Sequence, residues 1–127
     1  MCGIAGYVGS APPGLLSRML ATLKHRGPDE SGGWEGAGVA LGATRLAIID
    51  LVTGQQPMVS EDGRYTLVFN GEIYNYRALR RDLESAGHRF RTRSDTEVLL
   101  QTLATRGLAG VEALRGMFAF ACWDRGE

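Results

Sequence analysis

Short apolar segments bounded by glycine alternate along this chain with segments whose apolar side chains recur at helical spacing. Strands are predicted over 3–8, over one or two segments within 39–49, in a hairpin over 58–69 that turns at Asp62-Gly63, and over 117–123. Helices are predicted over 15–23, 75–86, 94–107 and 111–114, with polar or glycine-rich loops over 26–38 and 51–57. Because paired strands alternate with helices, the chain is predicted to form α+β layers.

Charge and cysteine usage exclude several classes of function. The 127 residues include 14 basic and 14 acidic side chains, so net charge indicates neither nucleic acid nor an anionic membrane as a partner. No apolar run approaches the roughly 20 residues of a bilayer-spanning helix, and the N-terminus lacks the features of a secretory signal. The two cysteines and two histidines make no metal-type spacing. These features predict a cytoplasmic protein with reduced thiols and no metal site.

Cys2 is the residue that says most about chemistry. If Met1 is removed, which a small second residue permits, Cys2 carries a thiol and a free α-amine side by side. An α-amine with a pKa near roughly 7.7–8.0 is partly neutral at cytoplasmic pH, so it can accept the thiol proton. One residue would then serve as both nucleophile and base. Position alone leaves open the alternative that Cys2 is an ordinary buried residue at the start of a strand.

A series of further motifs decides between these alternatives. The motifs are MCGIAG at 1–6, HRGPD at 25–29, RLAIID at 45–50, GQQPM at 54–58, NGEIYN at 70–75, SDTE at 94–97 and GMFAF at 116–120. They resemble, in the same order, those of the class II glutamine amidotransferases, which are N-terminal nucleophile hydrolases. The RLAIID and NGEIYN motifs resemble the asparagine synthetase branch of that family.

The resemblance assigns the catalytic roles to three residues. Cys2 would be the nucleophile, and the oxyanion hole would be formed by the side-chain amide of Asn70 and the backbone N–H of Gly71. Donors placed in advance at a developing oxyanion are worth roughly 2.7–4 kcal/mol of barrier each. The competing interpretation of Asn70-Gly71 is a hairpin turn. The pair stands at the end of a predicted apolar strand and the residues after it are not typical of a strand, which favours the catalytic role.

Substrate recognition is implied for residues that match the family's charged positions. Arg45 would bind the α-carboxylate of glutamine, since a guanidinium can grip both oxygens. Glu72 and Asp95 would bind the α-ammonium, although Asp95 also suits the start of a helix on physical grounds. The resemblance also places backbone groups of Ile48 and Ile49 against the substrate.

Three further residues are less clearly assigned. Arg26, in the HRGPD motif, either borders the nucleophile or braces its own loop. Ala43 stands where family members often carry histidine, a departure that does not touch the nucleophile or the base. Cys122 lies in an apolar predicted strand with no basic neighbour, so it is interpreted as a core residue.

The resemblance implies an α+β fold built as a four-layer α-β-β-α sandwich with two mainly antiparallel sheets. It also implies L-glutamine as the substrate, hydrolysed through a Cys2 thioester to glutamate and ammonia. Residues 1–127 would be the N-terminal portion of a glutaminase domain, incomplete at its C-terminus and not necessarily active alone.

In the asparagine synthetase branch, a C-terminal synthetase domain consumes the ammonia and uses ATP and Mg. Neither that domain nor an ATP motif occurs in this sequence, and the segment itself needs no cofactor. Two alternatives stay open: an amidotransferase domain serving another acceptor, and a non-catalytic scaffold that keeps the fold. A homodimer is also left open.

Overall fold

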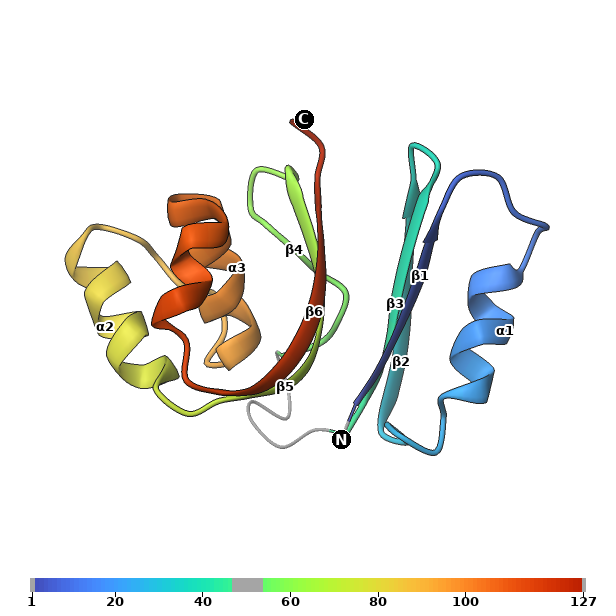
Figure 1. Ribbon diagram of the computed structural model, residues 1–127, viewed down its shortest axis with the longest axis horizontal. Coiled ribbons are helices and arrows are strands. Elements are labelled where there is room, and N and C mark those ends of the chain that lie inside the picture. Colours follow the sequence, from blue (N-terminus) through green and yellow to red (C-terminus); the bar gives the residue numbers. More distant parts are fainter. Residues whose placement is uncertain (1, 47–53, 127) are drawn as a thin grey trace.

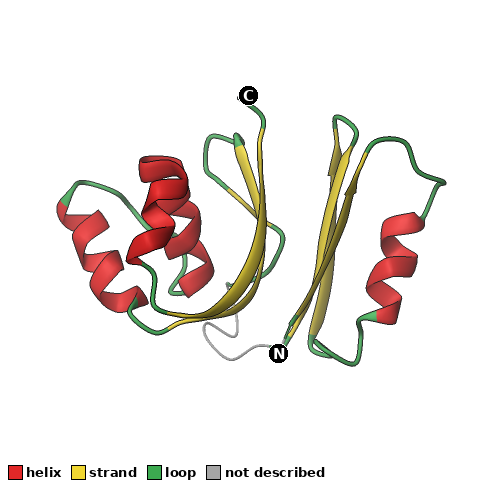
Figure 2. Cartoon of the chain, viewed as in Figure 1, coloured by secondary structure: helices red, strands yellow, loops and turns green. Residues whose placement is uncertain are grey.

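Two antiparallel sheets face each other, and helices cover the outer face of each sheet, in the computed structural model of the protein (Figure 1). The structure describes residues 2–46 and 54–126. Helix α1 lies on one outer side and helices α2 and α3 on the other, with both sheets between them (Figure 2). This arrangement confirms the predicted α-β-β-α sandwich. None of the described helices has the length and apolarity that crossing a membrane requires.

The first sheet has the strand order β1-β3-β2 and is covered by α1. Its strands are β1 (Gly3–Val8), β2 (Glu30–Gly36) and β3 (Val39–Arg45), and its helix is α1 (Leu15–Thr22). The central strand β3 is buried along its whole length. Leu16 and Leu20 of α1 pack close to the sheet because Gly42 has no side chain; a Cβ there would lie only 2.8 Å from the Leu20 Cδ1 atom.

Strand β2 corrects the prediction of a loop over 26–38. All seven of its residues pair with β3, from Glu30 opposite Arg45 to Gly36 opposite Val39. The β2–β3 turn has positive φ at both Ala37 and Gly38, which suits a two-residue hairpin. Glycine-rich β2 has low intrinsic strand propensity, but pairing with a fully buried neighbour overrides it.

The second sheet has the strand order β4-β5-β6. Its strands are β4 (Met58–Val59), β5 (Tyr65–Ile73) and β6 (Gly116–Asp124). The predicted hairpin is confirmed, since β4 and β5 pair antiparallel on either side of a turn at Asp62-Gly63. Strand β5, however, continues past Phe69 to Ile73. Asn70-Gly71 therefore lies inside a paired strand, opposite Ala119 and Phe118, and not at a strand end as predicted.

Three helical segments cover the outer face of the second sheet: α2 (Tyr76–Ser85), α3 (Asp95–Arg106) and the short 3-10 helix η1 (Gly107–Ala113). Leu67 and Phe69 of β5 pack there against Leu83, Leu99 and other apolar side chains of the helices. The inner faces of the two sheets meet through a smaller apolar cluster of Val39, Leu41, Ala43 and Val68.

The predicted capping box at the start of α3 forms in part. The Ser94 hydroxyl accepts a hydrogen bond from the Glu97 N–H, as an N-cap should. The Glu97 carboxylate does not return the bond to Ser94; it accepts from the backbone N–H groups of Arg91 and Thr92. Glu97 therefore ties the preceding loop to the helix.

Candidate active site

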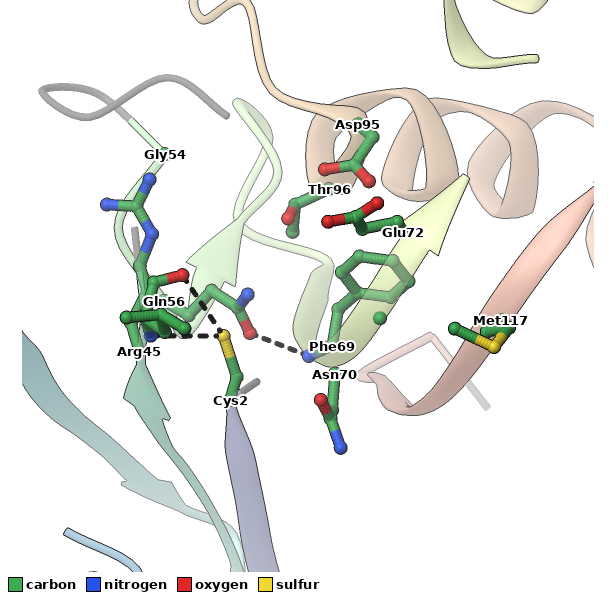
Figure 3. Close-up of a pocket in the computed structure, with 12 residues that line it drawn as sticks. Cys2, Arg45, Gly54, Gln56, Phe69, Asn70, Glu72, Asp95, Thr96 and Met117 are labelled. Atoms are coloured by element: carbon green, nitrogen blue, oxygen red, sulfur yellow. Dashed lines mark hydrogen bonds between the residues drawn. The ribbon is translucent and has the colours of Figure 1, made fainter. Parts of the chain in front are cut away.

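A cavity of about 140 Å³ opens between the two sheets at the end where β1 begins and β3 finishes (Figure 3). Both sheets and the N-terminus of α3 contribute to its lining. Six of the predicted site residues line it: Cys2, Arg45, Asn70, Gly71, Glu72 and Asp95. The fold thus collects in one place residues that come from both ends and the middle of the sequence.

Cys2 sits directly before β1, and its half-buried thiol is held by the backbone of the residue that directly follows β3. The Leu46 N–H donates a hydrogen bond to the Cys2 Sγ atom at 3.4 Å, and the thiol lies 3.8 Å from the Leu46 carbonyl oxygen. The β1–β3 register, which sets Gly3 opposite Thr44, brings the two segments together. The nucleophile candidate is therefore fixed one residue away from Arg45.

Arg45 ends β3 and is buried, with 5% of its surface exposed. One guanidinium nitrogen lies 3.0 Å from a carboxylate oxygen of Glu30, the residue directly opposite in β2. This cross-strand ion pair orients the guanidinium at the cavity. Sequence reasoning missed Glu30 because it assigned that segment to a loop, and the pair depends on the strand register.

Asn70 and Gly71 lie on the β5 wall of the cavity, on the opposite sheet from Cys2. The Asn70 Oδ1 atom is buried and has no hydrogen-bond partner within the part of the chain that the structure describes. Gly71 has φ of 148°, and a Cβ there would collide with the Met117 carbonyl oxygen of β6. Only glycine fits this position, and the neighbouring Asn70 has a buried acceptor oxygen that can take a hydrogen bond from a ligand.

Glu72 and Asp95 present their carboxylates side by side in Figure 3. Asp95 stands in the first turn of α3 and accepts a hydrogen bond of 3.0 Å from the Ile73 N–H. Burial raises the pKa of Asp95, and the negative charge of Glu72 raises it further, while backbone hydrogen bonds act in the opposite direction. A paired, partly desolvated acidic site of this kind favours a cationic ligand group, which would relieve the repulsion.

The structure adds pocket-lining residues that had no role assigned from the sequence. Gln56 is the most informative, because its side-chain oxygen accepts a hydrogen bond of 2.6 Å from the Phe69 N–H. The motif at 54–58 indicated a loop, but a side-chain bond to a strand in the other half of the hairpin left no local signal. Thr96 and Met117 also line the cavity.

Three predicted positions are not at this cavity or cannot be placed. Arg26 is exposed in the turn after α1 and is not among the residues that line the cavity. Ile48 and Ile49 lie outside the described residues, as does Met1. Among the described residues, no cluster of three or more His, Cys, Asp or Glu side chains could hold a metal ion.

The chain belongs to the glutamine amidotransferase domain family, whose family model matches residues 1–127. It is 42% identical to asparagine synthetase [glutamine-hydrolyzing] 1 of Bacillus subtilis, over all of this chain and 21% of that protein. A putative asparagine synthetase of Mycobacterium tuberculosis is 44% identical over 96% of this chain and 20% of its own length. The chain thus spans about a fifth of these relatives.

Solved structures support the same fold. The glutamine phosphoribosylpyrophosphate amidotransferase of B. subtilis superimposes with a TM-score of 0.78 over 98% of this chain and 35% of that chain. At 23% identity, this likeness concerns the fold alone. It agrees with the N-terminal nucleophile hydrolase architecture that the motifs implied.

Proposed function

We propose that this domain hydrolyses the side-chain amide of glutamine to glutamate and ammonia, with Cys2 as the nucleophile once Met1 is removed. One observation carries the proposal. A thiol, a buried guanidinium, a glycine amide and two carboxylates converge on a single cavity between the sheets. These are the groups that an acyl-transfer site for a free amino acid requires.

Recognition follows from the charges around the cavity. The Arg45 guanidinium, held by Glu30, suits the α-carboxylate of glutamine, and the Glu72–Asp95 pair suits its α-ammonium. Binding both the α-carboxylate and the α-ammonium selects glutamine strongly over analogues that lack either group, because such an analogue leaves buried charges of the site unpaired. The glutamine side chain then extends toward Cys2.

The reaction proceeds through a thioester. The Cys2 thiol passes its proton to the α-amine of the same residue, and Sγ forms a bond to the amide carbon. The oxyanion of the tetrahedral intermediate accepts hydrogen bonds from the Asn70 side chain and the Gly71 N–H. The α-amine returns the proton to the nitrogen, the C–N bond breaks and ammonia leaves. Water then cleaves the thioester, which releases glutamate and restores the thiol.

The fate of the ammonia is part of the proposal. The relatives named above are asparagine synthetases and are about five times longer than this chain. We infer that in a longer protein this domain supplies ammonia to an ATP- and Mg-dependent synthetase domain that makes asparagine. The proposed compartment is the cytoplasm.

A labelling experiment tests the nucleophile. Treatment with a diazo-ketone analogue of glutamine, followed by intact-mass measurement and peptide mapping, is expected to give one adduct, on Cys2. Cys122 should stay unlabelled, because burial raises the pKa of its thiol to about 11. A Cys122→Ala variant should label like the wild type, and Cys2→Ala should not label or hydrolyse glutamine. An adduct on Cys122 alone, or retention of Met1 in a protein that hydrolyses glutamine, contradicts the proposal.

A further inference from the structure

We infer that Gln56 is a positioning residue. It holds β5, the strand that carries Asn70 and Gly71, at the distance from Cys2 that catalysis requires. This inference rests on the proposed function. Gln56 lines the cavity and belongs to neither sheet, and its side chain reaches Phe69 of β5 (Figure 3). Its backbone lies against Gly32 of β2. Its contacts lie on the strand that carries Asn70 and Gly71 and on the sheet whose first strand follows Cys2.

The contact with the second sheet takes the place of a backbone hydrogen bond between β4 and β5. The register pairs Met58 with Leu67 and Val59 with Thr66, so its continuation would set residue 56 opposite Phe69. Strand β4 begins only at Met58, so residue 56 is not part of it. The Phe69 N–H bonds instead to the Gln56 side-chain oxygen at 2.6 Å. The side-chain carbonyl therefore does what a backbone carbonyl would do in a longer strand.

The contact with the first sheet uses the Gln56 backbone. A Cβ placed on Gly32 of β2 would collide with the Gln56 carbonyl oxygen and come within 3.3 Å of the Pro57 ring. Gly32 is paired with Ala43 of β3, the same strand whose end holds Cys2 through Leu46. The backbone of residue 56 is thus seated against the sheet of the nucleophile.

The two contacts act on the residue next to the oxyanion hole. Phe69 is buried and directly precedes Asn70, so without the Gln56 acceptor its N–H would have to find another partner. The strand would shift or admit water at the cavity wall, which would displace the Asn70 amide and the Gly71 N–H relative to Cys2. Displacing a catalytic group by about 1 Å can cost about 100-fold in rate.

The test compares size-matched variants in the purified protein. Gln56→Met removes the acceptor at nearly constant volume and is expected to lower kcat for glutamine hydrolysis about 10- to 100-fold, with little change in KM. The affinity for an aldehyde analogue of glutamine, which adds to the thiol and places an oxyanion in the hole, should fall in parallel. The affinity for glutamate, which makes no tetrahedral adduct, should stay within about twofold.

Gln56→Glu keeps an acceptor oxygen at the same reach and should recover part of kcat. The matched control is Gln101→Met, which changes a half-buried glutamine of α3 outside the cavity lining and should leave kcat unchanged. Amide hydrogen exchange at Phe69 should be faster in Gln56→Met, which checks the contact even where folding is weakened. Each rate is divided by the folded fraction of the variant, which thermal unfolding measures.

The outcomes separate the two claims. A wild-type protein that hydrolyses no glutamine overturns the proposed function and this inference with it. An active wild type whose Gln56→Met variant keeps its kcat overturns the inference alone. So does a variant in which glutamate and aldehyde affinities fall equally, because that pattern would show a structural and not a positioning role.

Discussion

At the scale of single residues, three of the charged and reactive groups of the site are each held by a partner from a different segment. The Cys2 thiol is held by Leu46, the Arg45 guanidinium by Glu30, and the Asp95 carboxylate by the Ile73 N–H. Groups held in this way need little reorganisation when substrate binds, which is a condition for strong electrostatic catalysis. The cost appears in Asp95, where burial raises the pKa of the carboxyl.

Replacing Asp95 by asparagine should separate binding from folding. The asparagine oxygen can still accept the Ile73 N–H, but the charge that pairs with the substrate ammonium is lost. A charge-assisted hydrogen bond is worth about 1.5–3 kcal/mol, so the KM for glutamine is expected to rise about 10- to 100-fold. Steady-state kinetics measure this, with Asp82→Asn on the exposed face of α2 as the control. An unchanged KM would show that Asp95 does not bind substrate.

The effect of Asp95→Asn on the free energy of unfolding depends on pH, in a direction that the raised pKa predicts. Because the pKa of Asp95 is raised in the folded state, the folded protein binds this proton more tightly than the unfolded chain does. That contribution to the free energy of unfolding is present at low pH and is lost as the pH rises through the raised pKa. The melting temperature of Asp95→Asn relative to the wild type should therefore increase with pH in the absence of substrate.

At the scale of elements, the N-terminus of α3 and the end of β5 form one unit. Asp95 opens the helix and bonds to the backbone of the last β5 residue, and Ser94 caps the same turn. Asn70, Gly71 and Glu72 lie on that stretch of β5. The placement of the ammonium site therefore depends on how the helix begins.

Removing the cap tests this dependence. Ser94→Ala leaves the Glu97 N–H without its acceptor and is expected to lower the free energy of unfolding by about 1 kcal/mol. It should also raise the KM for glutamine, because Asp95 follows directly. Ser85→Ala, at the exposed end of α2, is the matched control and should change neither quantity. Urea denaturation and kinetics provide the measurements; a loss of stability without a change in KM would mean that Asp95 keeps its place without the cap.

At the scale of the whole molecule, the site exists only because two sheets face each other. Cys2 directly precedes β1 and Arg45 ends β3, both strands of the first sheet, whereas Asn70, Gly71 and Glu72 lie on β5 of the second. The spacing between the sheets is set at the cavity by a close approach, where the Gln56 backbone lies against Gly32. A change at this contact should therefore act on the catalytic geometry without altering any catalytic group.

Two adjacent glycines of β2 provide the comparison. In Gly32→Ala the new methyl group would meet the rigid Gln56 backbone, whereas in Gly33→Ala it would meet the flexible end of Leu16 at 2.9 Å. Gly32→Ala is expected to cost about 1–3 kcal/mol of stability and to lower kcat. Gly33→Ala should cost less and leave kcat per folded protein unchanged. Equal effects on kcat in the two variants would show that the sheet spacing at Gly32 has no special role.

Local sequence patterns determined much of this protein. A glycine-bounded apolar run predicted the bounds of β1, the Asp62-Gly63 pair predicted the hairpin, and apolar spacing and the capping box predicted the starts of α2 and α3 to within a residue or two. The motifs indicated Cys2, Arg45, Asn70, Gly71, Glu72 and Asp95, and all of them line the cavity. These features are readable because turn chemistry, helix capping and the nature of a nucleophile depend on residues close together in the chain.

Tertiary structure alone decided the rest. Strand β2 forms because β3 offers it a complete ladder, the Glu30–Arg45 ion pair follows from that register, and Gln56 acts through a bond to a strand thirteen residues away. Pairing and close approach between distant segments depend on backbone positions that no short stretch of sequence encodes. The identity of the reactive groups was thus local information, whereas the distances between them were set by how two sheets pack.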